Sequence, residues 1–159
     1  MLWIWFLSSR DLYGKLLDIC VSTNLNPKTI RHIVGVPNHI RVWKRNVYWD
    51  IGGYNRRISV ADDYELVVRT FLKTKMLKIP KLGYLQFIHN SGQNTHNVRR
   101  NDIQRRIRTI ADFYNQQIHD RFIELGKKDW AFDENPTNPL MTPSRFGDDE
   151  EYVNGVYED

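Results

Sequence analysis

Cysteine and long apolar runs are what this sequence has least of. Cys20 is the one cysteine among 159 residues, so an internal disulfide framework and a cysteine-based zinc site are excluded. The opening run Met1–Leu7 is apolar, but it is much shorter than the roughly 20 residues of a membrane-spanning helix, and no basic stretch precedes it as in a signal peptide. We therefore expect no transmembrane segment, a cytoplasmic location, and a buried strand or helix start at Met1–Leu7.

Positive charge is spread along most of the chain, whereas the C-terminal end is acidic. The formal net charge is +4. Removing six acidic residues near the C-terminus leaves +10 on residues 1–147; the six are Asp148, Asp149, Glu150, Glu151, Glu158 and Asp159. A body this basic favours an anionic partner, such as a nucleotide diphosphate, a phospholipid-linked acceptor or nucleic acid. A solvated charged face accounts for the same charge equally well.

Two segments have the apolar spacing of amphipathic helices. The first begins at Asp62, with apolar side chains at i, i+3, i+4 and i+7: Tyr64, Val67, Val68 and Phe71. The second runs from Asn101 to Leu125 and is expected to end at Gly126; its apolar positions are Ile103, Ile107, Ile110, Phe113 or Tyr114, Ile118, Phe122 and Leu125. Its start is basic, which opposes the helix dipole and suggests a nearby anion or acidic surface; the residues are Arg99, Arg100, Arg105, Arg106 and Arg108.

The remaining segments are shorter and richer in turn residues. Residues 27–54 are expected to form loops and strands that lead to a Gly-Gly turn. The runs 76–79 and 82–88 lie on either side of Pro80 and are predicted to be two strands. Residues 131–159, with three prolines and the acidic run, are expected to be extended or disordered. Together these patterns predict an α/β chain, more closely an α+β fragment.

The sharpest local feature is a glycine pair followed by an acidic pair at a helix start. Gly52 and Gly53 allow backbone angles and close approaches that other residues do not, so a ligand can come near the chain there. Asp62 and Asp63 fall in the first turn of the predicted helix, where unpaired N–H groups favour acidic side chains. The pair by itself is common in proteins; with the glycine context it indicates a site.

These segments resemble family-2 glycosyltransferases of the GT-A type. That family has a strand leading to Gly-Gly-Tyr/Phe-Asn, then an acidic pair opening a helix of the form Glu/Asp-Asp-x-Asp/Glu-Leu-x-x-Arg. This chain reads Trp49-Asp-Ile-Gly-Gly-Tyr-Asn55 and Ala61-Asp-Asp-Tyr-Glu-Leu-Val-Val-Arg69. The resemblance covers about Asn26 to Trp130 and implies the C-terminal, acceptor-side part of a nucleotide-diphospho-sugar transferase fold with a long C-terminal amphipathic helix.

The resemblance also implies roles for individual residues. It assigns to Asp63 the general base that takes the proton of the acceptor hydroxyl, and to Asp62 the neighbouring acidic position that orients the acceptor or supports the base. Gly52 and Gly53 are then expected beside the substrate. The function implied is transfer of a sugar from a nucleotide-sugar donor to a glycan or other hydroxyl acceptor.

Two histidines and one arginine are further candidates. His89 occupies the place where the family has a histidine followed by Asn, Ser or Thr residues, and is a candidate ligand for a divalent metal or contact to the diphosphate. Many relatives place an arginine two residues earlier, whereas this chain has Phe87. His39 and Arg41 are candidate contacts to an anionic donor or acceptor, and a structural role in a loop explains them equally well.

The donor half of such an enzyme is what the sequence does not supply. No Asp-x-Asp motif occurs, and only a short segment precedes Asn26. The resemblance implies a divalent cation, Mn²⁺ or Mg²⁺, most of whose ligands are missing from this chain. We therefore expect a fragment or subunit whose donor site belongs to another chain, with three regions: an unassigned apolar segment, the glycosyltransferase half and an acidic tail, residues 1–25, 26–130 and 131–159.

Two other functions remain open from the sequence. One is a noncatalytic remnant that binds glycans or a partner protein. The other, less favoured, is a nucleic-acid-binding module, suggested by basic residues beside aromatic ones in the segment from Trp43 to Tyr48. No recognised nucleic-acid-reading motif accompanies that segment, so we expect no nucleic-acid partner.

Overall fold

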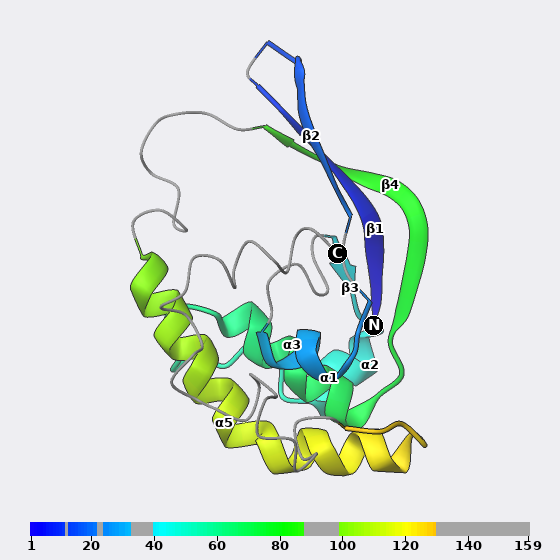
Figure 1. The fold of residues 1–159 in the computed structure, drawn as a ribbon, viewed down its shortest axis with the longest axis vertical. Coiled ribbons are helices and arrows are strands. Elements are labelled where there is room, and N and C mark those ends of the chain that lie inside the picture. Colours follow the sequence, from blue (N-terminus) through cyan, green and yellow to red (C-terminus); the bar gives the residue numbers. More distant parts are fainter. Residues whose placement is uncertain (12, 22–23, 33–39, 88–98, 130–159) are drawn as a thin grey trace.

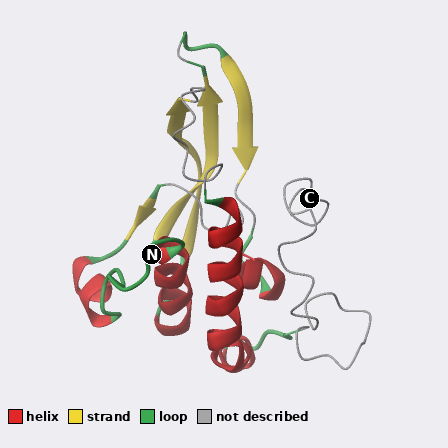
Figure 2. Cartoon of the chain, turned by 90° about the vertical axis from the view of Figure 1, so that its left-hand side faces the viewer, coloured by secondary structure: helices red, strands yellow, loops and turns green. Residues whose placement is uncertain are grey.

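The structure, a computed structural model, describes residues 1–11, 13–21, 24–32, 40–87 and 99–129. It combines one sheet with a group of helices, which confirms the mixed α and β class. The strands extend upward from the helical part, so that the upper half of the sheet stands clear of the helices (Figure 1). A quarter turn of the view shows the same separation between strands and helices (Figure 2).

The sheet is organised around its first strand, β1 (Leu2–Arg10). On one edge β1 pairs antiparallel with β2 (Leu16–Val21) and, at its start, with the two-residue strand β3 (Arg41–Val42). On the other edge it pairs parallel with β4 (Leu77–Phe87) along almost its whole length. The apolar opening run is therefore a strand, as expected. Because β1 pairs with β2 and also with β3 and β4, the predicted regions 1–25 and 26–130 contribute strands to one sheet.

Pro80 does not divide two strands, so that prediction is wrong. β4 is continuous through it, and the pairing with β1 shifts register between Ile4 and Leu7, opposite the stretch from Ile79 to Tyr84. Proline has no N–H to donate, and it is tolerated in sheets at edge strands and irregularities. β4 is such a strand, since β1 is its one pairing partner among the described residues.

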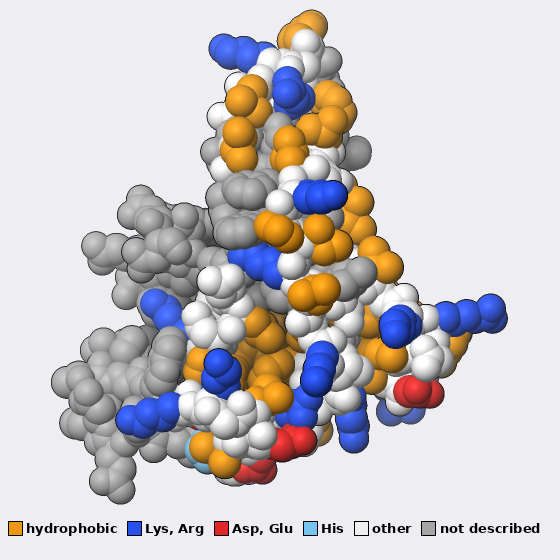
Figure 3. All heavy atoms as spheres, turned by 90° about the vertical axis from the view of Figure 1, so that its right-hand side faces the viewer, with side chains coloured by type: hydrophobic (Ala, Val, Ile, Leu, Met, Phe, Trp, Pro, Cys, Tyr) orange, Lys and Arg blue, Asp and Glu red, His pale blue; other side chains and the backbone are white. Residues whose placement is uncertain are grey.

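Large apolar side chains are exposed along β2 and β4; they are Leu16, Leu17, Ile19, Leu77, Leu82, Leu85 and Phe87. Hydrophobic side chains cover much of the upper, projecting part of the face shown in Figure 3. Lysines at positions 15, 78 and 81 lie among them. Within the described residues, no helix is long and apolar enough to cross a bilayer.

Two short helices occupy the stretch for which loops and strands were predicted. α1 (Pro27–His32) begins with a reciprocal pair of hydrogen bonds, in which the Thr29 N–H donates to Asn26 Oδ1 (2.8 Å) and the Asn26 N–H to Thr29 Oγ1 (2.9 Å). α2 (Arg45–Asp50) has no buried residue and ends at the Gly-Gly turn. The prediction is right for β3 and wrong for these helices.

The core lies between α1, α3 (Asp62–Lys73) and α5 (Arg100–Glu124). The four apolar positions predicted on the first helix are all buried, as are four of those on the second: Tyr64, Val67, Val68 and Phe71; Ile107, Ile110, Ile118 and Phe122. Of the two alternatives at the middle of α5, Tyr114 packs against this core and Phe113 is exposed. Both helices thus begin close to where the periodicity predicts, and α5 ends at Glu124, next to the expected end at Leu125.

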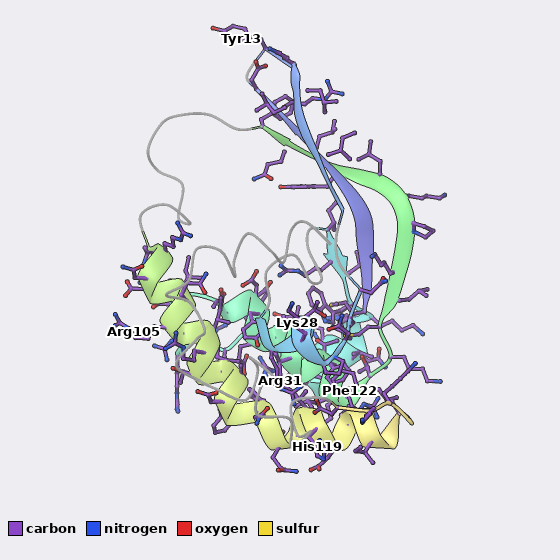
Figure 4. The ribbon with its side chains drawn as sticks, viewed as in Figure 1. Tyr13, Lys28, Arg31, Arg105, His119 and Phe122 are labelled. Carbon is purple, nitrogen blue, oxygen red and sulfur yellow. The ribbon has the colours of Figure 1, made fainter. Side chains whose placement is uncertain are left out.

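A buried ion pair joins α1 to the segment after α5. Arg31 donates to both carboxylate oxygens of Asp129 (3.0 and 2.7 Å), and its Nε donates to Asn115 Oδ1 (2.8 Å). Both charged side chains are almost fully buried, and His119 Nδ1 lies 3.3 Å from Asp129 Oδ2. Figure 4 shows Arg31 on α1 and His119 on α5 in this region. The predicted acidic tail and its disorder lie outside the described residues.

Candidate functional site

The two glycines form the turn that follows α2. The Gly52 N–H donates to the Trp49 carbonyl and the Gly53 N–H to the Tyr48 carbonyl, both at 2.9 Å. Their φ angles are +85° and +60°, in the left-handed region that glycine enters without steric cost. The predicted Gly-Gly turn is confirmed.

The space beside Gly53 is filled by the protein itself. A Cβ at this position would lie 3.0 Å from the ring of Tyr48. The Tyr48 hydroxyl also accepts a hydrogen bond from the Tyr54 N–H at 3.2 Å, so the ring closes the turn on the side next to Gly53. The need for glycine here is therefore explained by an internal contact, and the expected contact of Gly52 and Gly53 with substrate stays a prediction.

Replacing Gly53 by alanine is expected to destabilise the fold by more than the same change at Gly126. Both residues have a left-handed backbone, with φ +60° and +66°, but a Cβ at Gly126 would meet no atom within 4 Å. The backbone strain, about 1–2 kcal/mol, is common to both variants. The collision with Tyr48 adds about 1–3 kcal/mol for Gly53→Ala alone. Urea unfolding measures both; equal losses would show that the contact with Tyr48 is unimportant.

Arg69 of α3 holds the glycine turn in place. Its guanidinium donates to the carbonyl of Ile51 and, at 2.7 Å, to the carbonyl of Gly53. The same group forms a two-pronged ion pair with Glu65, with distances of 2.7 and 2.6 Å. A guanidinium can make all four contacts because its donors lie in one rigid plane. The turn and the start of α3 are thereby fixed relative to each other.

Glu65 is itself held from the other side by α5. It is buried, and the Tyr114 hydroxyl donates to its Oε1 at 3.0 Å. Burial, this hydrogen bond and the nearby negative charge raise the pKa of Tyr114 to about 12, so the phenol stays protonated and continues to donate at neutral pH. Tyr114, Glu65 and Arg69 thus connect α5 to the glycine turn.

The acidic pair lies at the start of α3, as predicted. The helix begins at Asp62, directly after Ala61, whose φ of +58° is unusual for a residue with a side chain. Asp63 Oδ1 accepts a hydrogen bond from the N–H of Tyr64 at 2.8 Å. This contact fixes the carboxylate near the N-terminus of α3, where the free backbone N–H groups favour a negative charge.

Arg41 and Asp63 are brought together by the fold. Arg41 lies at the start of β3, and one of its terminal nitrogens donates to Asp63 Oδ2 at 2.9 Å. The arginine side chain is 12% exposed and the aspartate 40% exposed, so the carboxylate remains open to a ligand while its charge is compensated from the protein side. The structure supplies a contact within the molecule for Arg41; a contact with an anionic ligand stays a prediction.

Tyr54, which directly follows the glycine pair, is influenced by the charges of Arg41, Asp62 and Asp63. Burial raises the pKa of its phenol; the Arg41 guanidinium acts in the opposite direction, and the Asp63 and Asp62 carboxylates raise it further. The charges of Arg41, Asp62 and Asp63 thus all act on this phenol. Arg41, Tyr54, Asp62 and Asp63 form the candidate site, which combines two carboxylates, one guanidinium and one aromatic hydroxyl.

The two candidate histidines lie outside the described residues. His39 falls in the range 33–39 and His89 in the range 88–98. The described part of the chain brings together no group of three or more His, Cys, Asp or Glu side chains suited to a metal ion. We therefore assign no metal ligands within it, and the divalent cation stays an expectation.

Three residues were not assigned roles from the sequence: Tyr54, which belongs to the candidate site, and Glu65 and Arg69, which fix the glycine turn relative to α3. Glu65 and Arg69 belong to the helix motif and are four residues apart, a spacing that pairs opposite charges on one helix face. That spacing was a usable signal for the ion pair, but not for the contacts of Arg69 with the turn, which depend on how α2 and α3 pack. Tyr54 follows the glycine pair directly and occupies the Tyr/Phe position of the motif, which was a signal that could have marked it.

No protein-family model, curated protein or solved structure matches this chain. A functional proposal therefore depends on the candidate site and on the sequence motifs that meet there.

Proposed function

We propose that this chain is the acceptor-side part of a family-2 glycosyltransferase of the GT-A type, with Asp63 as its general base. The observation that carries the proposal is the meeting of the two motif segments: the glycine turn is joined through Arg69 to the same helix that begins with the acidic pair. The resemblance in sequence thus concerns residues that also lie together in space.

In the proposed reaction, an acceptor hydroxyl attacks the anomeric carbon of a nucleotide-bound sugar. The new bond joins the acceptor oxygen to that carbon, and the bond from the carbon to the diphosphate oxygen breaks. The diphosphate leaves with the bonding electrons, and the hydroxyl proton passes to the Asp63 carboxylate. A hydroxyl becomes an effective nucleophile when a positioned base shares its proton in this way.

The contacts of Asp63 suit this role. Each of its oxygens accepts one hydrogen bond, from the Tyr64 N–H and from Arg41, and these two contacts fix the orientation of the carboxylate. An ionised carboxylate has about four acceptor positions, so capacity remains for an acceptor hydroxyl on the exposed side. Asp62 is its neighbour in the first turn of α3, and we propose that Asp62 and the phenol of Tyr54 orient the acceptor.

The nucleotide-sugar donor is proposed to bind to a separate segment or chain. The sequence has no Asp-x-Asp motif to hold a metal-bound diphosphate, so the cation and the donor belong to that other part. The cytoplasmic location also stays a prediction.

The test is reconstitution of transfer from two parts. The chain is mixed with donor-binding halves of family-2 enzymes, each made as a separate polypeptide, together with nucleotide-sugars and glycan acceptors. We expect release of nucleoside diphosphate that requires both polypeptides and rises with acceptor concentration. Binding of glycans by the chain without transfer in any mixture would instead identify the noncatalytic remnant.

A further inference from the structure

A concave feature lies at the start of α5, and its lining includes none of Arg41, Tyr54 and Asp63. It is half open to solvent and has a volume of about 330 Å³. One side comes from the segment just before α3 and the other from the first turns of α5; the lining includes Ser59, Val60, Arg99, Asp102, Arg105 and Arg106. We call it the arginine cavity. Figure 4 shows Arg105 on this first part of α5.

Positive charge exceeds negative charge in the arginine cavity. Among the described residues that line it, Asp102 has the one carboxylate, which lies 3.9 Å from Arg99 and 4.0 Å from Arg105, at the outer limit for an ion pair. These side chains are well exposed, so the pairs contribute little. Arg106 makes no hydrogen bond or ion pair with any described residue. Three guanidinium groups therefore share one weakly held carboxylate.

The backbone increases this imbalance. α5 begins at Arg100, so its first N–H groups and the positive end of its dipole are on the same side of the molecule as the arginines. The residue at its N-cap, Arg99, makes no capping hydrogen bond with its side chain. Water screens the repulsion between these exposed arginines, and the same donors would stabilise a bound anion.

We propose that the arginine cavity binds a phosphate group of a small anionic ligand. Guanidinium groups match phosphate oxygens with pairs of parallel hydrogen bonds, and the Ser59 hydroxyl is a further donor at the rim. The proposal requires neither sugar transfer nor a donor half. Its test is therefore direct binding to the chain alone, and its failure would leave the role of Asp63 untouched.

The first measurement is calorimetric titration of the chain with inorganic pyrophosphate at low ionic strength. We expect saturable binding to one site that weakens as sodium chloride is added, because salt screens the exposed arginines. The double variant Arg105→Gln/Arg106→Gln is expected to bind at least about 10-fold more weakly, the effect of losing charge-assisted hydrogen bonds. Both side chains are exposed, so the variant is expected to melt at the wild-type temperature.

A matched control removes the same charge elsewhere. Lys15 lies in the turn between β1 and β2, and Lys127 lies beyond the other end of α5; both are exposed. Lys15→Gln/Lys127→Gln should keep the wild-type affinity for pyrophosphate. If the wild-type chain does not bind, or if the two double variants bind equally, the arginine cavity is not a phosphate site.

Vesicles distinguish the two sources of a phosphate group. The chain is sedimented with phosphatidylcholine vesicles that contain or lack phosphatidic acid. Binding to pyrophosphate alone identifies a soluble phosphate ligand, and phosphatidic-acid-dependent sedimentation that needs Arg105 and Arg106 identifies a lipid headgroup. The absence of both kinds of binding overturns the proposal.

Discussion

Replacing Asp63 by asparagine is expected to slow sugar transfer by about 10²- to 10⁴-fold, the contribution typical of a general base. Asparagine has nearly the same shape, but its single amide oxygen can keep only one of the two hydrogen bonds that Arg41 and the Tyr64 N–H now donate to separate oxygens of Asp63. It cannot take up the proton of the acceptor hydroxyl. We therefore expect kcat to fall while the fold is retained, as measured by nucleoside diphosphate release in the reconstituted system.

Two matched changes of aspartate to asparagine make this result specific. Asp62 is adjacent to Asp63 in the first turn of α3, so Asp62→Asn tests which carboxylate is the base and should have a smaller effect on kcat. Asp120 lies on the exposed side of α5, where it accepts a hydrogen bond from Gln116, and Asp120→Asn should leave transfer unchanged. Normal turnover by Asp63→Asn would show that the base is assigned wrongly.

Replacing Asp129 by alanine is expected to lower the free energy of unfolding by about 3–5 kcal/mol, the range for breaking a buried ion pair. Arg31 would then stay 4% exposed without its carboxylate partner, while its bonds to Asn115 and Pro27 would not neutralise the charge. The loss is large because a typical domain is stable by only about 5–15 kcal/mol. Urea unfolding followed by circular dichroism measures it.

Two further variants separate this effect from simple loss of a side chain. Asp120→Ala removes an exposed carboxylate from α5 and should change stability by about 0.5 kcal/mol or less. The double variant Arg31→Met/Asp129→Leu removes both buried charges, so it should recover much of the stability lost in Asp129→Ala. An Asp129→Ala protein as stable as the Asp120→Ala control would contradict the view that this ion pair joins α1 to α5.

The long helices could be predicted from sequence because their packing is periodic. Each apolar side chain at the predicted spacing on α3 is buried in the core, and Asp62 starts the helix where first-turn acids are favoured. The Gly-Gly turn was predictable for a similar local reason, since Gly52 and Gly53 have the left-handed angles that only glycine adopts easily.

The short helices were missed because six residues carry little periodicity and are not stable alone. α1 is held by tertiary contacts: Ile30 is in the core and Arg31 reaches Asp129. Asn26 as a helix cap followed by Pro27 was a local signal that favoured this helix start. The continuity of β4 through Pro80 had no local signal, because it depends on β1 as its pairing partner.

The candidate site also depends on contacts between distant segments, which leave no signal in any one stretch of sequence. The acidic pair and the glycine pair are visible in the sequence, but the contact between Arg41 and Asp63 joins residues 22 positions apart. Arg69 reaches the Ile51 carbonyl across 18 positions, and Tyr114 reaches Glu65 across 49. Such contacts follow from the packing of α3 against its neighbours, which no single segment encodes.

The exposed apolar strands have a consequence for how the isolated chain behaves at high concentration. β2 and β4 are the outer strands over most of the sheet, and their large apolar side chains are in contact with water. Outer strands of this kind pair readily with other copies, and lysines such as Lys78 and Lys81 oppose this by mutual repulsion. Added salt weakens that repulsion, so it should promote self-association while it weakens binding at the arginine cavity.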